Sequence, residues 1–224
     1  RRILVILFLG FSSGLPLLLV FSTLSIWLKV EGVSLTTIGL FSLVRTPYTF
    51  KFLWAPVIDR LALPVVTRWL GRRRGWAFVT QAVLMVSIIA LGMSNPAENP
   101  GLTALFAVFV AFSSASQDIV IDAYRVEVLT ENEQGAGAGA IVLGYRMGML
   151  CAGAGALWLA AAFPWQQVYA IMGGLVAVGM VTIFLAKEPE TGQSVQASDA
   201  EQARLARHLE DGRPEWLARL LAST

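Results

Sequence analysis

The chain has almost none of the residues that metal and redox chemistry require. Its 224 residues include one cysteine, Cys151, and one histidine, His208. A single cysteine excludes an internal disulfide and a cysteine-based metal cluster, and the histidine stands alone in a polar segment. We therefore expect no metal site and no bound cofactor.

Charged residues are also scarce. They make up 14% of the chain, and the formal net charge is only +2. No basic patch of the kind that contacts phosphate groups is visible, so we expect no nucleic-acid partner. By contrast, 56% of residues are hydrophobic and the mean hydropathy is +0.65. This composition is typical of a protein embedded in a lipid bilayer.

Long apolar stretches predict the architecture. A helix needs about 20 residues to cross roughly 30 Å of hydrocarbon, and six stretches are long enough. They lie approximately at 3–27, 36–57, 76–93, 102–126, 138–162 and 166–186. They are too long and too weakly alternating for barrel strands, so we predict an all-α membrane protein with six transmembrane helices.

The composition changes abruptly after Ala186. We predict a six-helix transmembrane bundle over 1–187 and a cytoplasmic polar linker or tail over 188–224. Apolar residues in the tail recur at helical spacing. They are compatible with short amphipathic helices on the membrane surface and also with a loosely ordered linker.

Positive charge in the short loops predicts the orientation, because loops rich in lysine and arginine stay in the cytoplasm. The opposite loops contain only Lys29, so we expect both chain ends to be cytoplasmic. The cations on the cytoplasmic side are Arg1, Arg2, Arg60, Arg68, Arg72, Arg73, Arg74 and Lys187.

Ionisable residues inside the spans point to transport. Each costs about 2.5 kcal/mol or more at the centre of a bilayer, so such groups usually face a cavity, a partner charge or an ion path. Polar or charged spans one and two precede an uncharged third, and the same order recurs in spans four to six. This pattern predicts two inverted three-helix repeats. The charged residues are Arg45 and Lys51 in the second span, Asp118 and Asp122 in the fourth, and Arg146 in the fifth.

Depth places the opposite charges together. At 1.5 Å per helical residue, Lys51, Asp118 and Arg146 all lie about 12 to 16 Å from the cytoplasmic ends, near the midplane. They could line a water-filled site, or Arg146 could form a structural ion pair with Asp118 or Asp122. In the fifth span, small residues at steps of four predict close packing against another helix, with Arg146 on a different face. These small residues are Ala140, Gly144, Gly148, Ala152 and Ala156.

Four blocks of sequence resemble the AmpG muropeptide permeases of the major facilitator superfamily. They are FKFLWAPVIDR at 50–60, GRRRGW at 71–76, ASQDIVIDA at 115–123 and LGYRMGML at 143–150. The likeness covers nearly all of 3–190. It implies one six-helix half of a transporter, completed by a second half in the same or another chain. Arg45 departs from the pattern, because the family more often has a small uncharged residue there.

The resemblance implies a function. Such a protein imports anhydro-muropeptides, chiefly N-acetylglucosaminyl-anhydro-N-acetylmuramyl peptides, across the bacterial inner membrane with protons as the coupling ion, for peptidoglycan recycling. As a hypothesis, Asp118 or Asp122 accepts the proton. We expect Lys51, Gln117, Arg146, Tyr145 and Tyr48 to contact substrate. The resemblance further implies a cytoplasmic latch that comprises Asp59, Arg60, Arg72, Arg73 and Arg74.

Two alternatives remain open at this stage. One is a carrier of another anionic conjugate, such as acetyl-CoA. The other is a membrane-embedded enzyme, although the chain has no paired histidines, no metal-ligand spacing and no nucleophile motif beside a base. We therefore expect a transporter and not an enzyme.

Overall fold

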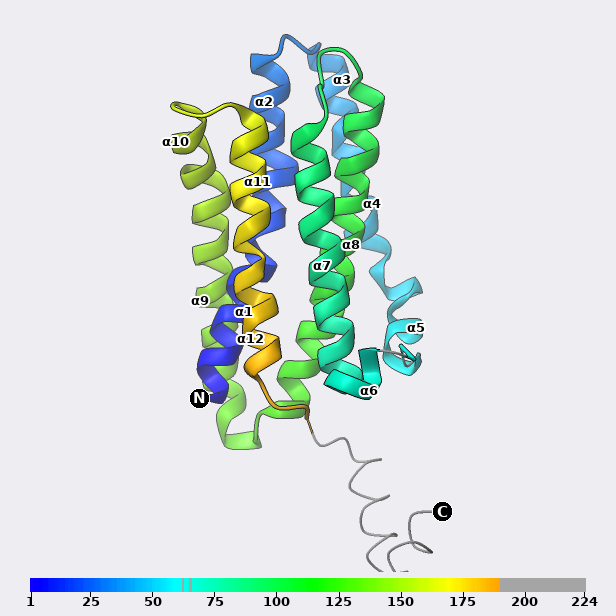
Figure 1. The fold of residues 1–224 in the computed structure, drawn as a ribbon, viewed down its shortest axis with the longest axis vertical. Coiled ribbons are helices and arrows are strands. Elements are labelled where there is room, and N and C mark those ends of the chain that lie inside the picture. The colour runs from blue at the N-terminus through cyan, green and yellow to red at the C-terminus, as the bar shows by residue number, and fades with distance from the viewer. Residues whose placement is uncertain (62, 65, 190–224) are drawn as a thin grey trace, which may run out of the picture. The chain divides into compact units, whose positions relative to one another are not determined.

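The computed structural model describes residues 1–61, 63–64 and 66–189. Residues 1–188 form one compact unit. Within the described residues every regular element is helical and no strand occurs, as the apolar stretches predict. Long helices run side by side through this unit (Figure 1). The predicted amphipathic pieces of the tail lie outside the described residues.

Five helical runs are long and apolar enough to cross a membrane. The first comprises α1 (Arg2–Leu18), a π-helical turn η1 (Leu19–Thr23) and α2 (Leu24–Val30). The third and fourth predicted spans are α7 (Arg72–Met93) and α8 (Pro100–Val128). The fifth predicted span begins with the 3-10 turn η4 (Glu131–Glu133) and continues through α9 (Gln134–Leu150), the π-helical turn η5 (Cys151–Gly155) and α10 (Ala156–Ala160). The sixth predicted span comprises α11 (Trp165–Leu175) and α12 (Ala177–Leu185).

The predicted span at 36–57 is not one continuous helix. It is a series of short segments: α3 (Leu35–Leu40), the 3-10 turn η2 (Phe41–Arg45), α4 (Thr46–Phe50), the 3-10 turn η3 (Lys51–Leu53) and α5 (Ala55–Arg60). Pro47 and Pro56 stand in the first turns of α4 and α5, where the missing N–H groups interrupt the helical hydrogen bonds. The segments still run along α8 (Figure 1). A short α6 (Val66–Leu70) precedes α7.

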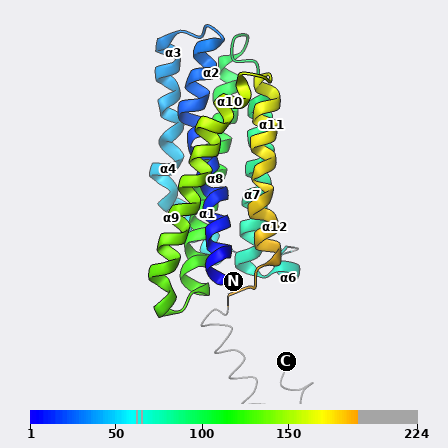
Figure 2. The ribbon, with the colours of Figure 1, turned by 90° about the vertical axis from the view of Figure 1, so that its left-hand side faces the viewer.

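The predicted stripe of small residues packs as expected. Gly144 and Gly148 approach the backbone of α1 so closely that a Cβ atom would lie 2.0 Å from the Leu7 oxygen and 2.2 Å from the Phe11 oxygen. All five residues of the stripe are buried. The first and fifth spans therefore form a tight pair, side by side in Figure 2.

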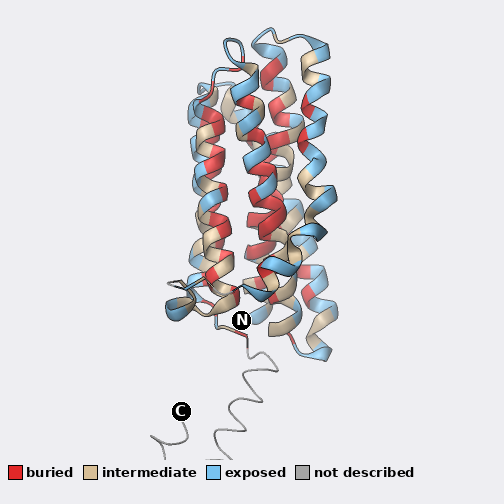
Figure 3. Cartoon of the chain, turned by 90° about the vertical axis from the view of Figure 1, so that its right-hand side faces the viewer, coloured by how far each residue is buried: buried red, intermediate tan, exposed pale blue. Residues whose placement is uncertain are grey.

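The core fills the space between α1, α2, α7, α8 and α11. Trp27 is 1% exposed, and its ring stacks on Trp165 at 5.7 Å and lies 5.1 Å from the ring of Tyr169. Buried residues follow the inward stripes of the helices, whereas the outer faces are exposed (Figure 3). Exposed apolar side chains cover those outer faces, which suits lipid contact.

The N-terminus and the end of α12 lie at the same end of the bundle (Figure 1). The Arg1 guanidinium donates a hydrogen bond to the Leu185 carbonyl oxygen at 3.4 Å. Which side of a membrane this end occupies is a prediction from the positive loops.

Candidate functional site

A cavity of about 500 Å³ opens between the first, second, fourth and fifth spans. It brings together five of the predicted site residues, although they come from three separate helical runs. The polar lining consists of Ser13 from α1, Lys51 from η3, Asp118 and Asp122 from α8, and Tyr145 and Arg146 from α9. Ile121, Ile141, Val142 and Met149 complete the wall.

The fourth span supplies both acids because Asp118 and Asp122 are four residues apart on one helix face. Asp118 is partly buried and accepts a hydrogen bond from the Ser13 hydroxyl. Asp122 is exposed to the cavity opening. One acid is therefore held by a neighbouring helix, whereas the other is accessible to solvent.

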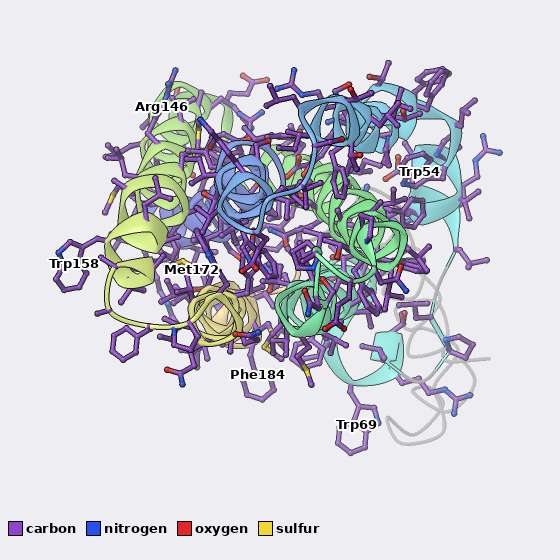
Figure 4. All side chains as sticks on the ribbon, turned by 90° about the horizontal axis from the view of Figure 1, so that it is seen from above. Trp54, Trp69, Arg146, Trp158, Met172 and Phe184 are labelled. Atoms are coloured by element: carbon purple, nitrogen blue, oxygen red, sulfur yellow. The ribbon has the colours of Figure 1, made fainter. Side chains whose placement is uncertain are left out.

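The fifth span supplies the cation from the face that does not pack on α1. Arg146 is exposed, whereas Gly144 and Gly148 are buried, as their spacing predicts. Seen from above, Arg146 and Trp158 lie on different sides of this span (Figure 4). Trp69, Trp158 and Phe184 project from the outside of the bundle, and Met172 lies within it.

The structural ion pair between Arg146 and an aspartate does not form in this structure. Among the described residues, Asp118 and Asp122 have no lysine or arginine nitrogen within 4.0 Å. Opposite charges thus share one cavity without contact. Such a cavity can bind a zwitterionic or anionic solute and can change its charge by taking up a proton.

Gln117 and Tyr48 do not line this cavity. The Gln117 side chain is fully buried in the bundle, and neither polar atom of its amide has a hydrogen-bond partner among the described residues. Tyr48 lies at a different cavity, between the first and second spans. Helix rotation separates Gln117 from its neighbour Asp118, because consecutive helical residues point about 100° apart.

The predicted latch residues meet at the end of the bundle that carries the N-terminus. Arg73 is the centre: its guanidinium contacts Asp59 at 2.6 Å and Glu127 at 2.5 Å. Arg72 donates to the Asp59 backbone oxygen, and Arg74 donates to the Ile183 and Phe184 carbonyls. Arg60 is exposed and forms no ion pair with a described residue.

Two acids in this cluster were not predicted from the sequence. Glu127, near the end of α8, binds Arg73, and the Glu188 carboxylate accepts hydrogen bonds from the backbone N–H groups of Arg73 and Arg74 at 2.8 and 3.0 Å. Glu188 thereby satisfies unpaired donors in the first turn of α7. An acid directly after the predicted span at 102–126 was a usable signal for Glu127. The Glu188 contact joins residues 115 positions apart and had no local signal.

The part of the chain that the structure describes contains no group of three or more histidine, cysteine, aspartate or glutamate side chains placed to hold a metal ion. The polar groups that line the cavity are two carboxylates, a lysine, an arginine, a phenol and the Ser13 hydroxyl.

Comparison with known proteins places these features in a family context. The model of the Major Facilitator Superfamily matches residues 1–223. The anhydromuropeptide permease of Escherichia coli strain K12 is 49% identical over 189 residues, which cover 84% of this chain and 38% of that protein. The permease of the same name from Escherichia coli O157:H7 matches with the same figures. An uncharacterized protein of Haemophilus influenzae is 39% identical over 191 residues, or 85% of this chain and 44% of its own length. The chain thus spans less than half the length of these relatives.

Proposed function

Because the chain belongs to the major facilitator superfamily, we propose that it forms half of a proton-coupled importer of anhydro-muropeptides. The substrate class comes from the name of the Escherichia coli relatives, anhydromuropeptide permease. We place the carrier in the bacterial inner membrane, with both ends of this chain in the cytoplasm and peptidoglycan recycling as its role.

The observation that carries the proposal is the cavity with both signs of charge inside a membrane-spanning bundle. Uncompensated charges at this depth are costly in lipid, so a ligand or an ion must offset them during function. Lys51 and Arg146 supply positive charge for substrate carboxylates, and Asp118 and Asp122 supply sites for protons. A muropeptide carries carboxylates on its peptide, which match the two cations.

The residue roles follow from exposure and contact. Asp118 is the first candidate for the proton site, because it is a partly buried acid that lines the cavity inside a membrane-spanning helix. Asp122 is the second. Tyr145 lines the cavity and offers a hydroxyl to sugar or amide groups. Gln117 and Tyr48 act as substrate contacts only in a conformation that turns them toward the cavity.

A second six-helix half completes the carrier in this proposal. Asp122 and Arg146 are exposed although they line the cavity, and this chain covers 38% of the length of the Escherichia coli permease. The latch around Arg73 lies at the cytoplasmic end and holds one conformation of the transport cycle by joining α5, α7, α8 and the segment after α12.

Uptake in proteoliposomes tests the proposal. The complete carrier is reconstituted in a checked orientation, and accumulation of labelled anhydro-muropeptide is followed with and without an inward proton gradient. We expect uptake that depends on the gradient. Absence of uptake would contradict the carrier function. Uptake that is equal with and without the gradient would contradict the proton coupling.

A substitution then tests the proton site. Asp118→Asn keeps the size of the side chain but cannot cycle between charged and neutral forms, so we expect loss of gradient-driven accumulation. Glu98→Gln removes an acid from an exposed loop outside the cavity and serves as the control. Wild-type accumulation by Asp118→Asn, with an unchanged pH profile, would assign the proton to another group.

A further inference from the structure

A second cavity, of about 770 Å³, lies between the first and second spans. Its lining comes from 17–25 and 38–49, which places it in the half of the bundle away from the N-terminus. None of the residues of the charged cavity described above lines it. We call it the outer cavity, and its polar lining consists of Ser22, Ser25, Ser42, Arg45, Tyr48 and Thr49.

Both walls of the outer cavity depart from α-helical geometry. The π-helical turn η1 carries Phe21, and the 3-10 turn η2 carries Arg45. Such irregular turns inside membrane helices reorient side chains and are frequent at functional sites. Here they bring the Arg45 guanidinium carbon to 4.5 Å from the centre of the Phe21 ring. The Tyr48 ring lies 6.0 Å from the same ring.

Arg45 is the one charged side chain in the lining, and it has no acidic partner within 4.0 Å among the described residues. The Phe21 ring covers one face of the guanidinium, which leaves the N–H groups on its edge available. An arginine in a span without an acid is a site for an anion supplied from outside.

The remaining groups define which anion fits. The Tyr48 hydroxyl is buried, so only the ring of this residue contributes to the lining of the outer cavity. Ser22, Ser42 and Thr49 supply hydroxyls, and the Phe21 and Tyr48 rings offer apolar surface. A guanidinium fork binds a carboxylate through two parallel hydrogen bonds. The hydroxyls and rings suit the polar edge and the apolar face of a sugar.

We propose that the outer cavity is a second substrate site, in which Arg45, stacked on Phe21, binds a carboxylate on the peptide of the substrate. The identity of the natural ligand rests on the proposed muropeptide function. The site captures substrate on the side of the bundle away from the N-terminus and precedes the cavity of Asp118 and Arg146 in the import path. Arg45 selects for the carboxylate, and the hydroxyls of Ser22, Ser42 and Thr49 bind sugar hydroxyls or amides.

Transport kinetics test the selectivity. The complete carrier is assayed with two substrates, an anhydro-muropeptide with free carboxylates and the same compound with its carboxylates amidated. For the free acid, we expect Arg45→Gln to raise KM about tenfold, the usual effect of losing one charge-assisted hydrogen bond, at nearly unchanged kcat. The KM of Arg45→Lys should fall between those of wild type and Arg45→Gln. For the amidated compound, the KM values of wild type and Arg45→Gln should differ much less.

Lys29→Gln is the matched control, because it removes a cation at the end of α2 that does not line the outer cavity. It should leave both KM values at the wild-type level. Equal KM values for wild type and Arg45→Gln would overturn the site, as would an equal rise for the acid and its amide. Thermal unfolding of each variant separates a binding defect from misfolding.

A binding measurement keeps this test independent of the proposed function. N-acetylmuramyl-L-alanyl-D-glutamate, which carries a sugar ring and peptide carboxylates, is titrated into the complete carrier in lipid nanodiscs. We expect weaker binding to Arg45→Gln than to wild type, and wild-type binding to Lys29→Gln. A protein that binds this probe through Arg45 but takes up no muropeptide retains the outer site and refutes the muropeptide function. No binding to wild type, or equal binding to all three proteins, overturns the site.

Discussion

The contact between the first and fifth spans makes a quantitative prediction for Gly144→Ala. A Cβ atom at this position would stand 2.0 Å from the Leu7 carbonyl oxygen and 2.9 Å from the Phe11 nitrogen. Both neighbours are backbone atoms, so no side chain can rotate away. Reaching the 3.4 Å at which ordinary contact begins requires the oxygen to retreat by the difference, about 1.4 Å.

The expected cost follows from two opposing effects. Overpacking a well-packed contact costs about 1 to 3 kcal/mol, whereas replacing glycine by alanine inside a helix stabilises it by about 0.5 to 1 kcal/mol. We therefore expect Gly144→Ala to lower the free energy of unfolding by up to about 2.5 kcal/mol. The separation of the two helices should also displace Arg146, two residues along α9.

Gly139 on the same helix provides the control, because a Cβ there would have nothing within 4 Å. Gly139→Ala should be neutral or stabilising by up to about 1 kcal/mol. Thermal unfolding in detergent, followed by tryptophan fluorescence, compares the two variants with wild type. If Gly144→Ala unfolds at or above the temperature of Gly139→Ala, the close packing of the two backbones is not a source of stability.

The cluster of charges around Arg73 leads to two further predictions. Arg73→Gln leaves the carboxylates of Asp59 and Glu127 without their shared cation, so we expect it to lower the free energy of unfolding by about 1 to 3 kcal/mol in denaturant. Arg68→Gln removes an exposed cation and should leave this free energy unchanged. Gly71 has φ +86°, and a Cβ would lie 2.4 Å from the Glu188 carboxyl carbon, whereas Gly32 has φ +79° and open space. Gly71→Ala should therefore lower the unfolding temperature more than Gly32→Ala, which adds only the backbone strain of roughly 1 kcal/mol. Equal decreases in unfolding temperature would show that the contact with Glu188 does not contribute.

The second span shows where prediction from an apolar stretch stops. Its length and hydropathy predict a crossing segment, and the short helices along α8 follow that path. The residues Pro47 and Pro56 were visible in the sequence, yet a proline predicts only a local interruption. The 3-10 turns η2 and η3 had no signal of their own in the sequence.

The two cavities illustrate the same limit for side chains. Helical spacing places Asp118 and Asp122 on one face and Arg146 away from the small residues of α9, and the structure agrees. Gln117 was expected beside Asp118 and instead lies buried in the bundle. Tyr48 was expected beside Lys51 and lies in the outer cavity.

The amino-acid order alone determines the helical membrane architecture, the positions of the charges along each span, and the face of the fifth span that packs. These follow from local rules: the thickness of the bilayer, the helical period and the energetic cost of charge in hydrocarbon. The tertiary structure decides that Arg73 joins Asp59 to Glu127, that Glu188 binds the first turn of α7, and that Asp118 bonds Ser13. Such pairings depend on the rotation and register of whole helices, which result from many weak packing contacts summed over the bundle.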